Sequence, residues 1–266
     1  MNIELSKVKE WLDINKLSLN FSKTNFMIIK SNRKKDACIN IKIFNKDGSF
    51  SLLERRNYVK YLGVILDDSL SWKNQISYIC SRISRNSGIL LRLRYYLPLN
   101  QLRQIYYNLI YPYLIYAIEA WGSTYKSNIQ RVQRKQNHVI RIIFFVYLYG
   151  KNTDSAKPLI NLFNILTVYN IYRFHVLKFF HKWHKGQLPN TFKNMSTYAK
   201  SVHNYNTRYA SKLNLYKPKV KTNVGKQTLS YSGSDIWADL PFDLKIVSTF
   251  SFDKKVKSYL LSLQHS

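Results

Sequence analysis

The chain has 266 residues, of which 42 are lysine or arginine and 14 are aspartate or glutamate, giving a formal net charge of +28. Hydrophobic residues make up 45% and aromatic residues 15%, which excludes a disordered tail and is enough for one or two folded domains. A compact chain with this charge repels itself, and a polyanion relieves the repulsion. We therefore expect nucleic acid as the partner, with an anionic membrane surface as the second choice.

The sequence shows no membrane or export signal. It has no run of about 18 or more apolar residues, and the apolar stretches 109–120 and 142–149 are short and rich in tyrosine. The N-terminus is charged and has no apolar signal core. Cys38 and Cys80 lack metal-binding spacing, so we expect buried free thiols in a reducing compartment. These features predict an intracellular protein, in the nucleus or the cytoplasm, with no membrane partner.

The first part of the chain predicts one short helix and then strands. Over residues 3–14, Ile3, Val8, Trp11 and Leu12 lie near one helix face at ~100° per residue. Short alternating runs follow, with a basic loop at 31–36 and an Asp-Gly hairpin turn at 46–48. The predicted strands are 26–30, 37–44, 50–54 and 58–66. One helix against a small sheet is an α+β arrangement.

The stretch 57–72 is the boundary between this sheet and a helical region. Tyr58 to Leu66 predicts one buried strand, and Asp67, Asp68 and Ser69 predict the turn that ends it. The adjacent aspartates invite a catalytic interpretation, but no second strand carries a partner aspartate. We expect a polar turn instead, with Ser69 or Ser71 capping the next helix.

From Trp72 onward the apolar residues recur at helical spacing. The predicted helices are 72–97, 99–121, 126–147 and 158–184. Pro98 ends the first of them, Pro112 should kink the second and Gly122 ends it. The core candidates of the fourth helix are Ile165, Val168, Tyr169, Tyr172, Val176, Phe179 and Phe180.

The C-terminal region changes character. Residues 186–224 are polar and basic and contain Gly186, Pro189 and Pro218, which predicts an irregular linker. Order should return over 229–240, and a last short helix should follow. That helix is suggested by the apolar residues Phe250, Phe252, Val256, Tyr259 and Leu260.

Basic residues gather on one face of two predicted helices. In the 126–147 helix, Arg131, Arg134, His138 and Arg141 lie on a face well separated from Val132, Val139, Ile143 and Val146. In the 72–97 helix, Arg82, Arg85 and Arg92 share a face. These faces lack acidic partners, and the guanidinium fork matches phosphate oxygens. We therefore predict two phosphate-binding faces, a plain solvated surface being the alternative.

Two further residue sets admit more than one interpretation. Tyr95, Tyr96, Tyr106 and Tyr107 could stack on bases, although tyrosines at helical spacing more often fill a core. His175, His181 and His184 suggest a metal site, because His181 and His184 are one helical turn apart. No cysteine or carboxylate completes that set, so we expect a basic, aromatic helix face.

Four stretches carry a family resemblance when they are taken in order. They are 11–20 followed by Ser22-Lys23-Thr24, 58–64 with Tyr61-Leu62-Gly63 and then Leu70-Ser71-Trp72, 106–116 with Trp121-Gly122, and 231–241. Together they resemble the C-terminal part of a non-LTR (LINE-type) retrotransposon reverse transcriptase. Lys23-Thr24 is similar to its motif D, Tyr61-Leu62-Gly63 to its primer-grip hairpin, 106–122 to its thumb and 231–241 to its tail segment.

The resemblance implies a fold and a set of nucleic-acid contacts. The implied fold is α+β, with a small antiparallel sheet as a palm remnant, then a mainly α-helical thumb and a short C-terminal segment. The implied parts are the palm remnant 1–71, the thumb 72–185, the basic irregular linker 186–224 and the tail 225–266. The expected nucleic-acid-binding residues are Lys23, Tyr61, Leu62, Gly63, Arg82, Arg85, Arg92, Arg131, Arg134 and Arg141.

The resemblance also bears on activity. The family consists of RNA-directed DNA polymerases that use Mg²⁺, and its catalytic aspartates lie N-terminal to motif D, before Met1. We therefore expect a truncated reverse transcriptase that is inactive by itself, with no catalytic residue, metal or cofactor of its own. A primer–template duplex or RNA is the expected partner, and the palm and fingers would belong to the full-length element.

Two other interpretations stay open. The chain is either a non-enzymatic, basic helical nucleic-acid-binding protein or a chain without a selected function. An in-frame upstream segment encoding an aromatic-x-Asp-Asp hairpin would favour the enzyme over both.

Overall fold

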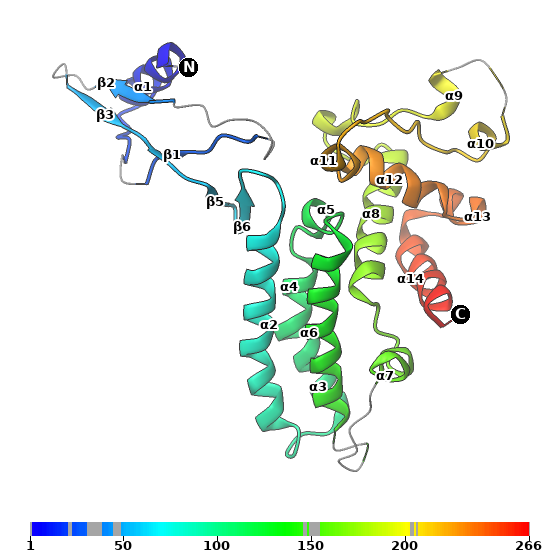
Figure 1. Ribbon diagram of the computed structural model, residues 1–266. Coiled ribbons are helices and arrows are strands. Elements are labelled where there is room, and N and C mark those ends of the chain that lie inside the picture. The colour runs from blue at the N-terminus through cyan, green and yellow to red at the C-terminus, as the bar shows by residue number, and fades with distance from the viewer. Residues whose placement is uncertain are drawn as a thin grey trace. The chain divides into compact units, whose positions relative to one another are not determined.

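The computed structural model describes residues 2–20, 23–30, 39–44, 49–145, 148, 155–202, 205 and 207–265. The chain forms two compact units, Met1–Asn74 and Gln75–Ser266, called unit 1 and unit 2 below. Unit 1 holds the paired strands and one helix, and unit 2 is helical (Figure 1). The chain is therefore α+β, as its sequence predicts. Its division into four parts stays a prediction.

Unit 1 contains three separate strand pairs and α1 (Asn2–Ile14). β2 (Lys42–Phe44) pairs with β3 (Phe50–Leu52) in antiparallel fashion, whereas β1 (Asn25–Phe26) pairs with β4 (Glu54–Arg55) in parallel. Prediction of a single antiparallel sheet is therefore wrong for the described residues. The strand predicted over 26–30 is also too long, because β1 ends at Phe26. The predicted loop 31–36 and turn 46–48, together with Cys38, lie outside the described residues.

The predicted strand 58–66 is a hairpin. β5 (Tyr58–Tyr61) turns back into β6 (Val64–Asp67), and Tyr61 is paired with Val64. Leu62 and Gly63 form the two-residue turn with φ of 44° and 84°, and positive φ at both positions is what a tight turn of this hand requires. The prediction of a continuous buried strand over 58–66 is therefore wrong. The turn was not predicted because Leu62-Gly63 is not the usual Asn-Gly turn sequence. Tyr58, Tyr61 and Leu62 are exposed.

The long helix α2 (Lys73–Leu93), most of which belongs to unit 2, buries Ile76, Ile79, Ile83 and Leu90, which recur at helical spacing. The helix predicted over 99–121 is wrong as a continuous element. It consists of α3 (Leu99–Ile105), the π-helical turn η1 (Tyr106–Ile110), α4 (Tyr111–Ile115) and α5 (Ile118–Trp121).

Two residues explain these interruptions. Pro112 stands in the first turn of α4, where its missing N–H removes no helical hydrogen bond. Ala117 has a φ of 51°, a left-handed conformation that separates α4 from α5. Gly122 ends α5, as predicted.

The next helices surround α8. α6 (Lys126–Phe144) confirms most of the helix predicted over 126–147. Phe145 lies in a turn, and 146 and 147 lie outside the described residues. The helix predicted over 158–184 is divided into α7 (Lys157–Leu162) and α8 (Val168–His184), with Asn164 at a φ of 51° between them. α8 packs against α4, α5, α6, α12 and α14.

The predicted linker 186–224 contains short helical turns. They are η2 (Asn190–Phe192), α9 (Ala199–Val202), α10 (Arg208–Ser211) and α11 (Asn223–Lys226). The chain then forms α12 (Leu229–Ala238), α13 (Phe242–Ile246) and α14 (Thr249–His265). Lys245 of α13 is buried and donates to Asn214 Oδ1 at 2.6 Å, which ties the 208–215 segment to the end of the chain.

Close packing brings α12 and α14 onto α8. A Cβ atom at Gly233 would lie 2.1 Å from the ring of Phe180, so only glycine permits this approach. Among the predicted core residues, Val168, Tyr172, Val176 and Phe180 are buried, and so are Phe252, Val256 and Leu260. The prediction is wrong for Tyr169, which is 53% exposed. Phe250 lies in α14 and is 100% exposed.

Candidate nucleic-acid interface

Helices α2 and α6 run parallel and side by side in unit 2. Near the start of both helices, Arg131 donates to the Ser77 hydroxyl at 3.2 Å. Just beyond their ends, the Arg94 guanidinium lies 3.8 Å from the centre of the Phe145 ring. The exposed faces of α2 and α6 are therefore adjacent. The sequence alone does not predict this arrangement.

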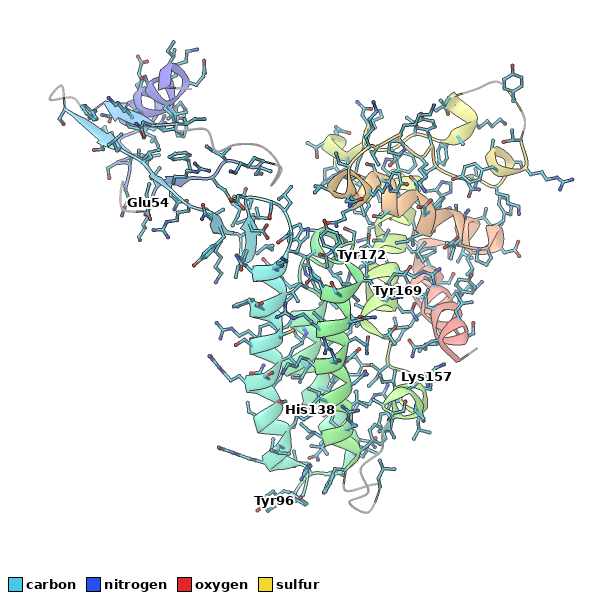
Figure 2. The ribbon with its side chains drawn as sticks, in the orientation of Figure 1. Glu54, Tyr96, His138, Lys157, Tyr169 and Tyr172 are labelled. Carbon is cyan, nitrogen blue, oxygen red and sulfur yellow. The ribbon has the colours of Figure 1, made fainter. Side chains whose placement is uncertain are left out.

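The basic face of α6 is built by helical periodicity. Val132, Val139 and Ile143 are buried, which confirms the predicted apolar face, whereas Val146 lies outside the described residues. On the other face, Arg131, Arg134 and His138 are exposed and Arg141 is half-buried (Figure 2 labels His138). Because the apolar face anchors the helix, these four side chains are held in one row.

The basic face of α2 is formed in the same way. Arg85 and Arg92 are exposed, and they lie within about 20° of each other around the helix. Arg82 is half-buried, and its guanidinium lies 5.0 Å from the centre of the Tyr78 ring. Each row, from Arg82 to Arg92 and from Arg131 to Arg141, is ~15 Å long at about 1.5 Å per residue.

The charges on this surface are not neutralised within the described part of the chain. None of the six arginines is ion-paired with a carboxylate there. Between Asp68 and Asp154 the only acidic residue in the sequence is Glu119. That carboxylate lies 3.3 Å from His175 Nδ1. Burial raises the pKa of Glu119, but the hydrogen bond with His175, a backbone hydrogen bond and the charges of His175 and Lys178 together outweigh burial, so the pKa is lowered.

The positive charges of this surface lower the pKa values of two nearby groups, Cys80 and His138. Burial raises the pKa of the Cys80 thiol. The positive charges of Arg131, Lys135 and Arg134, all on α6, act in the opposite direction and reduce the shift. Burial lowers the pKa of His138, and Arg141 and Lys135 lower it further. His138 is therefore neutral near pH 7, and the positive charge of this face comes from arginine and lysine.

This arrangement suits a phosphate backbone. One strand of a duplex carries a phosphate about every 3.4 Å along the axis, so each ~15 Å row spans roughly four phosphates. Guanidinium groups donate in a planar fork to phosphate oxygens, and such contacts position nucleic acid without reading its sequence. Lys135 on α6 and Arg94 just after α2 add to this basic surface, and neither residue was predicted from the sequence. The spacing of basic residues over 131–141 could have indicated Lys135.

The other predicted contacts belong to unit 1. The Lys23 side chain is exposed in a turn in which its backbone N–H donates to the Asn20 carbonyl at 3.1 Å. Tyr61 and Leu62 are exposed at the tip of the β5–β6 hairpin, beside Gly63. The predicted nucleic-acid-binding residues therefore form two groups: Lys23 and the hairpin tip in unit 1, and the arginine rows in unit 2.

The aspartate pair after β6 has a structural role. The Asp67 carboxylate accepts from the Ser69 hydroxyl at 2.8 Å and from the backbone N–H groups of Ser71 and Trp72 at 2.7 and 2.9 Å. The predicted polar turn before α2 is therefore confirmed, with Asp67 rather than either serine as its main acceptor. Asp67 is buried, and its carboxylate holds the turn that precedes α2. The N–H of Lys73, the first residue of α2, donates to Ser71 Oγ at 3.4 Å, in line with the predicted capping by that serine.

The histidines have separate partners. His181 Nε2 lies 3.0 Å from the Val247 carbonyl oxygen, and its ring stacks on Phe252 at 3.7 Å. His184 Nδ1 lies 2.5 Å from the Tyr198 hydroxyl. The described residues contain no group of three or more His, Cys, Asp or Glu side chains that could share a metal ion. No described helix has both the length and the apolar character of a membrane span.

The chain thus combines an α+β fold with a basic surface on the adjacent helices α2 and α6. The arginines of this surface have no ion-pair partner among the described residues. Comparison with known proteins identifies its relatives. The chain is 32% identical over 106 residues to a probable RNA-directed DNA polymerase from transposon X-element of Drosophila melanogaster. It is 29% identical over 111 residues to the corresponding protein from transposon BS of the same fly, and 32% identical over 108 residues to the RNA-directed DNA polymerase from mobile element jockey of Drosophila funebris.

These matches cover 39% to 41% of this chain, and the chain spans 12% of the length of each of these relatives. The chain therefore contains a region related to the reverse transcriptases of non-LTR retrotransposons, which confirms the resemblance noted in its motifs. No family model matches the chain. No solved structure matches it either.

Proposed function

We propose that this chain is a reverse-transcriptase-related segment that grips a primer–template duplex without polymerising by itself. The observation that supports it most directly is the pair of arginine rows on α2 and α6, which lack carboxylate partners among the described residues. In this proposal α2 to α8 act as the thumb, and their arginines hold the phosphate backbone. The relatives supply the class of nucleic acid, since each is named as an RNA-directed DNA polymerase.

Unit 1 would supply the contacts at the primer end. As a palm remnant, it presents the β5–β6 hairpin, whose tip exposes Tyr61 and Leu62. Gly63, at a φ of 84°, lets the backbone turn back within two residues. A tip of this kind packs against the sugar and base of a terminal nucleotide, and Lys23 offers a cation to a nearby phosphate.

The residues present do not fit the Mg²⁺ ions of the complete family enzyme. Two-metal phosphoryl transfer needs several carboxylates that converge on ions about 4 Å apart. Asp67 is buried, and its carboxylate already accepts three hydrogen bonds. We therefore assign no catalytic residue and no cofactor to this chain. Polymerisation would need a cluster of carboxylates that the described residues do not contain.

The binding proposal is tested by neutralising one arginine row. Replacing Arg131, Arg134 and Arg141 together by glutamine should weaken duplex binding by roughly tenfold or more at moderate salt. The loss should be equal across sequences, because phosphate contacts do not read bases. The slope of log affinity against log salt should become shallower by about 3. Fluorescence anisotropy with labelled duplexes at several salt concentrations measures both quantities.

A matched control separates the row from net charge. Replacing Lys254, Lys255 and Lys257 of α14 by glutamine removes the same formal charge from a different helix. This variant should bind nearly as the wild type does. If both variants lose affinity to the same extent, or if wild-type affinity barely depends on salt, the arginine rows are not phosphate sites.

The absence of polymerase activity gives a second test. The purified 266-residue chain should show no Mg²⁺-dependent extension of a labelled primer on an RNA template, because its aspartate pair does not fit the metals. A retroviral reverse transcriptase in the same assay is the positive control. Nucleotide incorporation above background that disappears with EDTA would contradict the proposal.

A second candidate function is a non-enzymatic, basic helical nucleic-acid-binding protein unrelated to primer handling. The net charge of +28 favours it, because charge alone supports binding to any polyanion. The two candidates differ at the hairpin tip. Replacing Tyr61 and Leu62 by serine should weaken binding to a recessed primer terminus relative to a blunt duplex only if the chain is a primer-gripping segment.

A further inference from the structure

A cavity of about 780 Å³ lies in unit 2 where α6 and α8 begin and α12 passes. It is distinct from the arginine rows, although it shares α6 with one of them. Three tyrosines line it: Tyr169 and Tyr172 of α8, which are labelled in Figure 2, and Tyr231 of α12. A cavity of this size holds a ligand as large as a nucleotide.

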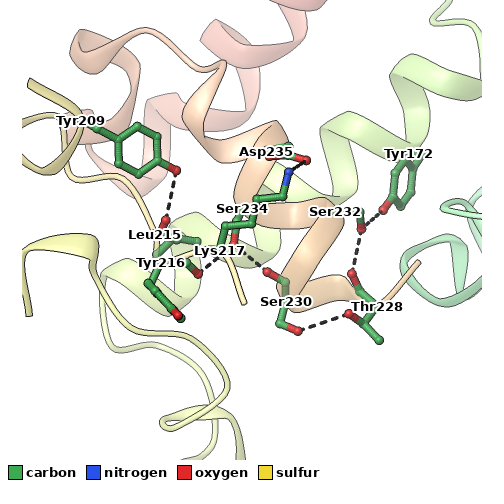
Figure 3. Close-up of polar contacts among 10 residues, drawn as sticks. All are labelled: Tyr172, Tyr209, Leu215, Tyr216, Lys217, Thr228, Ser230, Ser232, Ser234 and Asp235. Atoms are coloured by element: carbon green, nitrogen blue, oxygen red, sulfur yellow. Dashed lines mark hydrogen bonds and ion pairs between the residues drawn. The ribbon is translucent and has the colours of Figure 1, made fainter. Parts of the chain in front are cut away.

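The three rings differ in freedom. Tyr172 forms the floor: it is buried, its ring blocks any side chain at Gly122, and its hydroxyl lies 2.9 Å from Ser232 Oγ (Figure 3). Tyr231 is half-buried and holds the Lys217 ammonium 4.3 Å from its ring centre. Tyr169 is the most exposed of the three at 53%, and the Arg173 guanidinium lies 5.9 Å from its ring centre, so a large part of the ring still faces solvent.

Side chains of both charge signs line the cavity. Lys126, at the start of α6, and Lys226 of α11 are exposed and supply cations. Asp235 and Asp239 of α12 supply carboxylates. Asp235 accepts from Lys217 at 2.7 Å and Asp239 lies 3.8 Å from Arg173, but their side chains stay 53% and 67% exposed. A carboxylate has about four acceptor positions, so each retains free ones.

We propose that this cavity takes one unpaired nucleotide of the bound nucleic acid, with a base that carries an exocyclic amino group. Tyrosine rings stack on the base, the amino group donates to Asp235 or Asp239, and the flanking phosphate pairs with Lys126 or Lys226. Adenine, cytosine and guanine donate through such a group, whereas thymine and uracil do not.

The proposal rests on the proposed function, because the strand has to reach the cavity along α6. Lys126 precedes Arg131 and Arg134 on that helix by ~8 and ~12 Å at about 1.5 Å per residue. A strand held by the arginine row therefore needs only two or three further nucleotides to reach the mouth. A peptide is a less suitable occupant, since this continuity with phosphate-binding residues favours a nucleotide.

The experiment compares two DNA duplexes that differ by a single unpaired 2-aminopurine at one end. Wild-type protein should bind the duplex with the unpaired base about 5- to 30-fold more tightly than the blunt duplex, and should quench its fluorescence. Tyr169→Ala should remove this preference and leave the blunt affinity unchanged. Tyr169→Phe keeps the ring and should keep the preference, which assigns the effect to stacking, while the unchanged blunt affinity of Tyr169→Ala excludes a folding defect as the cause.

A second pair of duplexes tests the role of the carboxylates. An unpaired cytosine should bind several-fold more tightly than an unpaired thymine, because only cytosine donates from its exocyclic amino group. Equal affinity for these two bases would overturn the assignment of Asp235 and Asp239.

The remaining outcomes are separable. If wild type binds blunt and overhanging duplexes equally, with unchanged 2-aminopurine emission, the cavity is not a base site and the proposed function stands. A preference that survives in Tyr169→Ala also overturns the inference. If neither duplex is bound, the proposed function and this inference fail together.

Discussion

Asp67 shows at the scale of one residue how an aspartate pair can look catalytic and act as a structural cap. Its carboxylate accepts two backbone N–H groups, from Ser71 and Trp72, and the Ser69 hydroxyl. These donors belong to the turn that starts α2, where no helical carbonyl is available to them. The sequence contains the same signal, since a serine-rich turn after a strand is typical of a helix start, and only the choice of acceptor was missed.

Replacing Asp67 by alanine should destabilise the protein by about 1–3 kcal/mol, because it leaves buried backbone donors unsatisfied. Asp68 is the matched control: it takes part through its backbone, donating to Asn57 O and accepting from Lys30 N–H. Asp68→Ala should therefore change stability by less than about 0.5 kcal/mol. Urea unfolding followed by circular dichroism measures both, and equal effects of the two substitutions would contradict the capping role.

At the scale of elements, the sequence predicts helices better than their interruptions. The 3.6-residue period locates α2 and α6 because each buries one continuous stripe. It also locates α1, although Ile3, Val8 and Trp11 of the predicted apolar face are exposed. The breaks at Ala117 and Asn164 come from left-handed residues, each at a φ of 51°. Asparagine adopts this conformation more readily than most residues, but alanine gives no local signal for it. The arginine faces could be predicted from the same period, but the adjacency of α2 and α6 and the cavity beside α12 depend on tertiary packing and could not.

The packing of α12 on α8 gives the prediction at this scale. Gly233→Ala should destabilise unit 2 by roughly 2 kcal/mol or more, because the new methyl group would lie 2.1 Å from the Phe180 ring. Gly88→Ala in α2 is the matched control, since nothing lies within 4 Å of a Cβ atom there. That control should stabilise the chain by about 0.5–1 kcal/mol through helix propensity. The two changes in unfolding free energy should have opposite signs.

Relief of the steric clash provides a further check. Phe180→Leu shortens the blocking side chain, so the double variant with Gly233→Ala should lose less stability than the sum of the single losses. Strict additivity in this cycle would mean that Gly233 is needed for its backbone and not for the close approach of α12.

Across the whole molecule, the charge of +28 has opposite effects on folding and on binding. Like charges repel in the compact state, so a high net charge destabilises the fold, and salt screens this repulsion. Salt also competes for the arginine rows, so it weakens the attraction to phosphate. The unpaired cations that suit the surface for nucleic acid therefore reduce the stability of the free protein.

Raising sodium chloride from low to moderate concentration should increase the melting temperature of the free chain by about 2–4 °C, equivalent to about 1 kcal/mol at this size. Over the same range, duplex affinity should fall steeply. The Lys254, Lys255 and Lys257 to glutamine variant carries three fewer charges, so it should melt higher at low salt and gain less from added salt. Scanning calorimetry of both proteins at matched salt, beside anisotropy titrations, measures the two trends. A melting temperature that falls with salt would show that ion pairs, rather than repulsion, dominate the electrostatics of the fold.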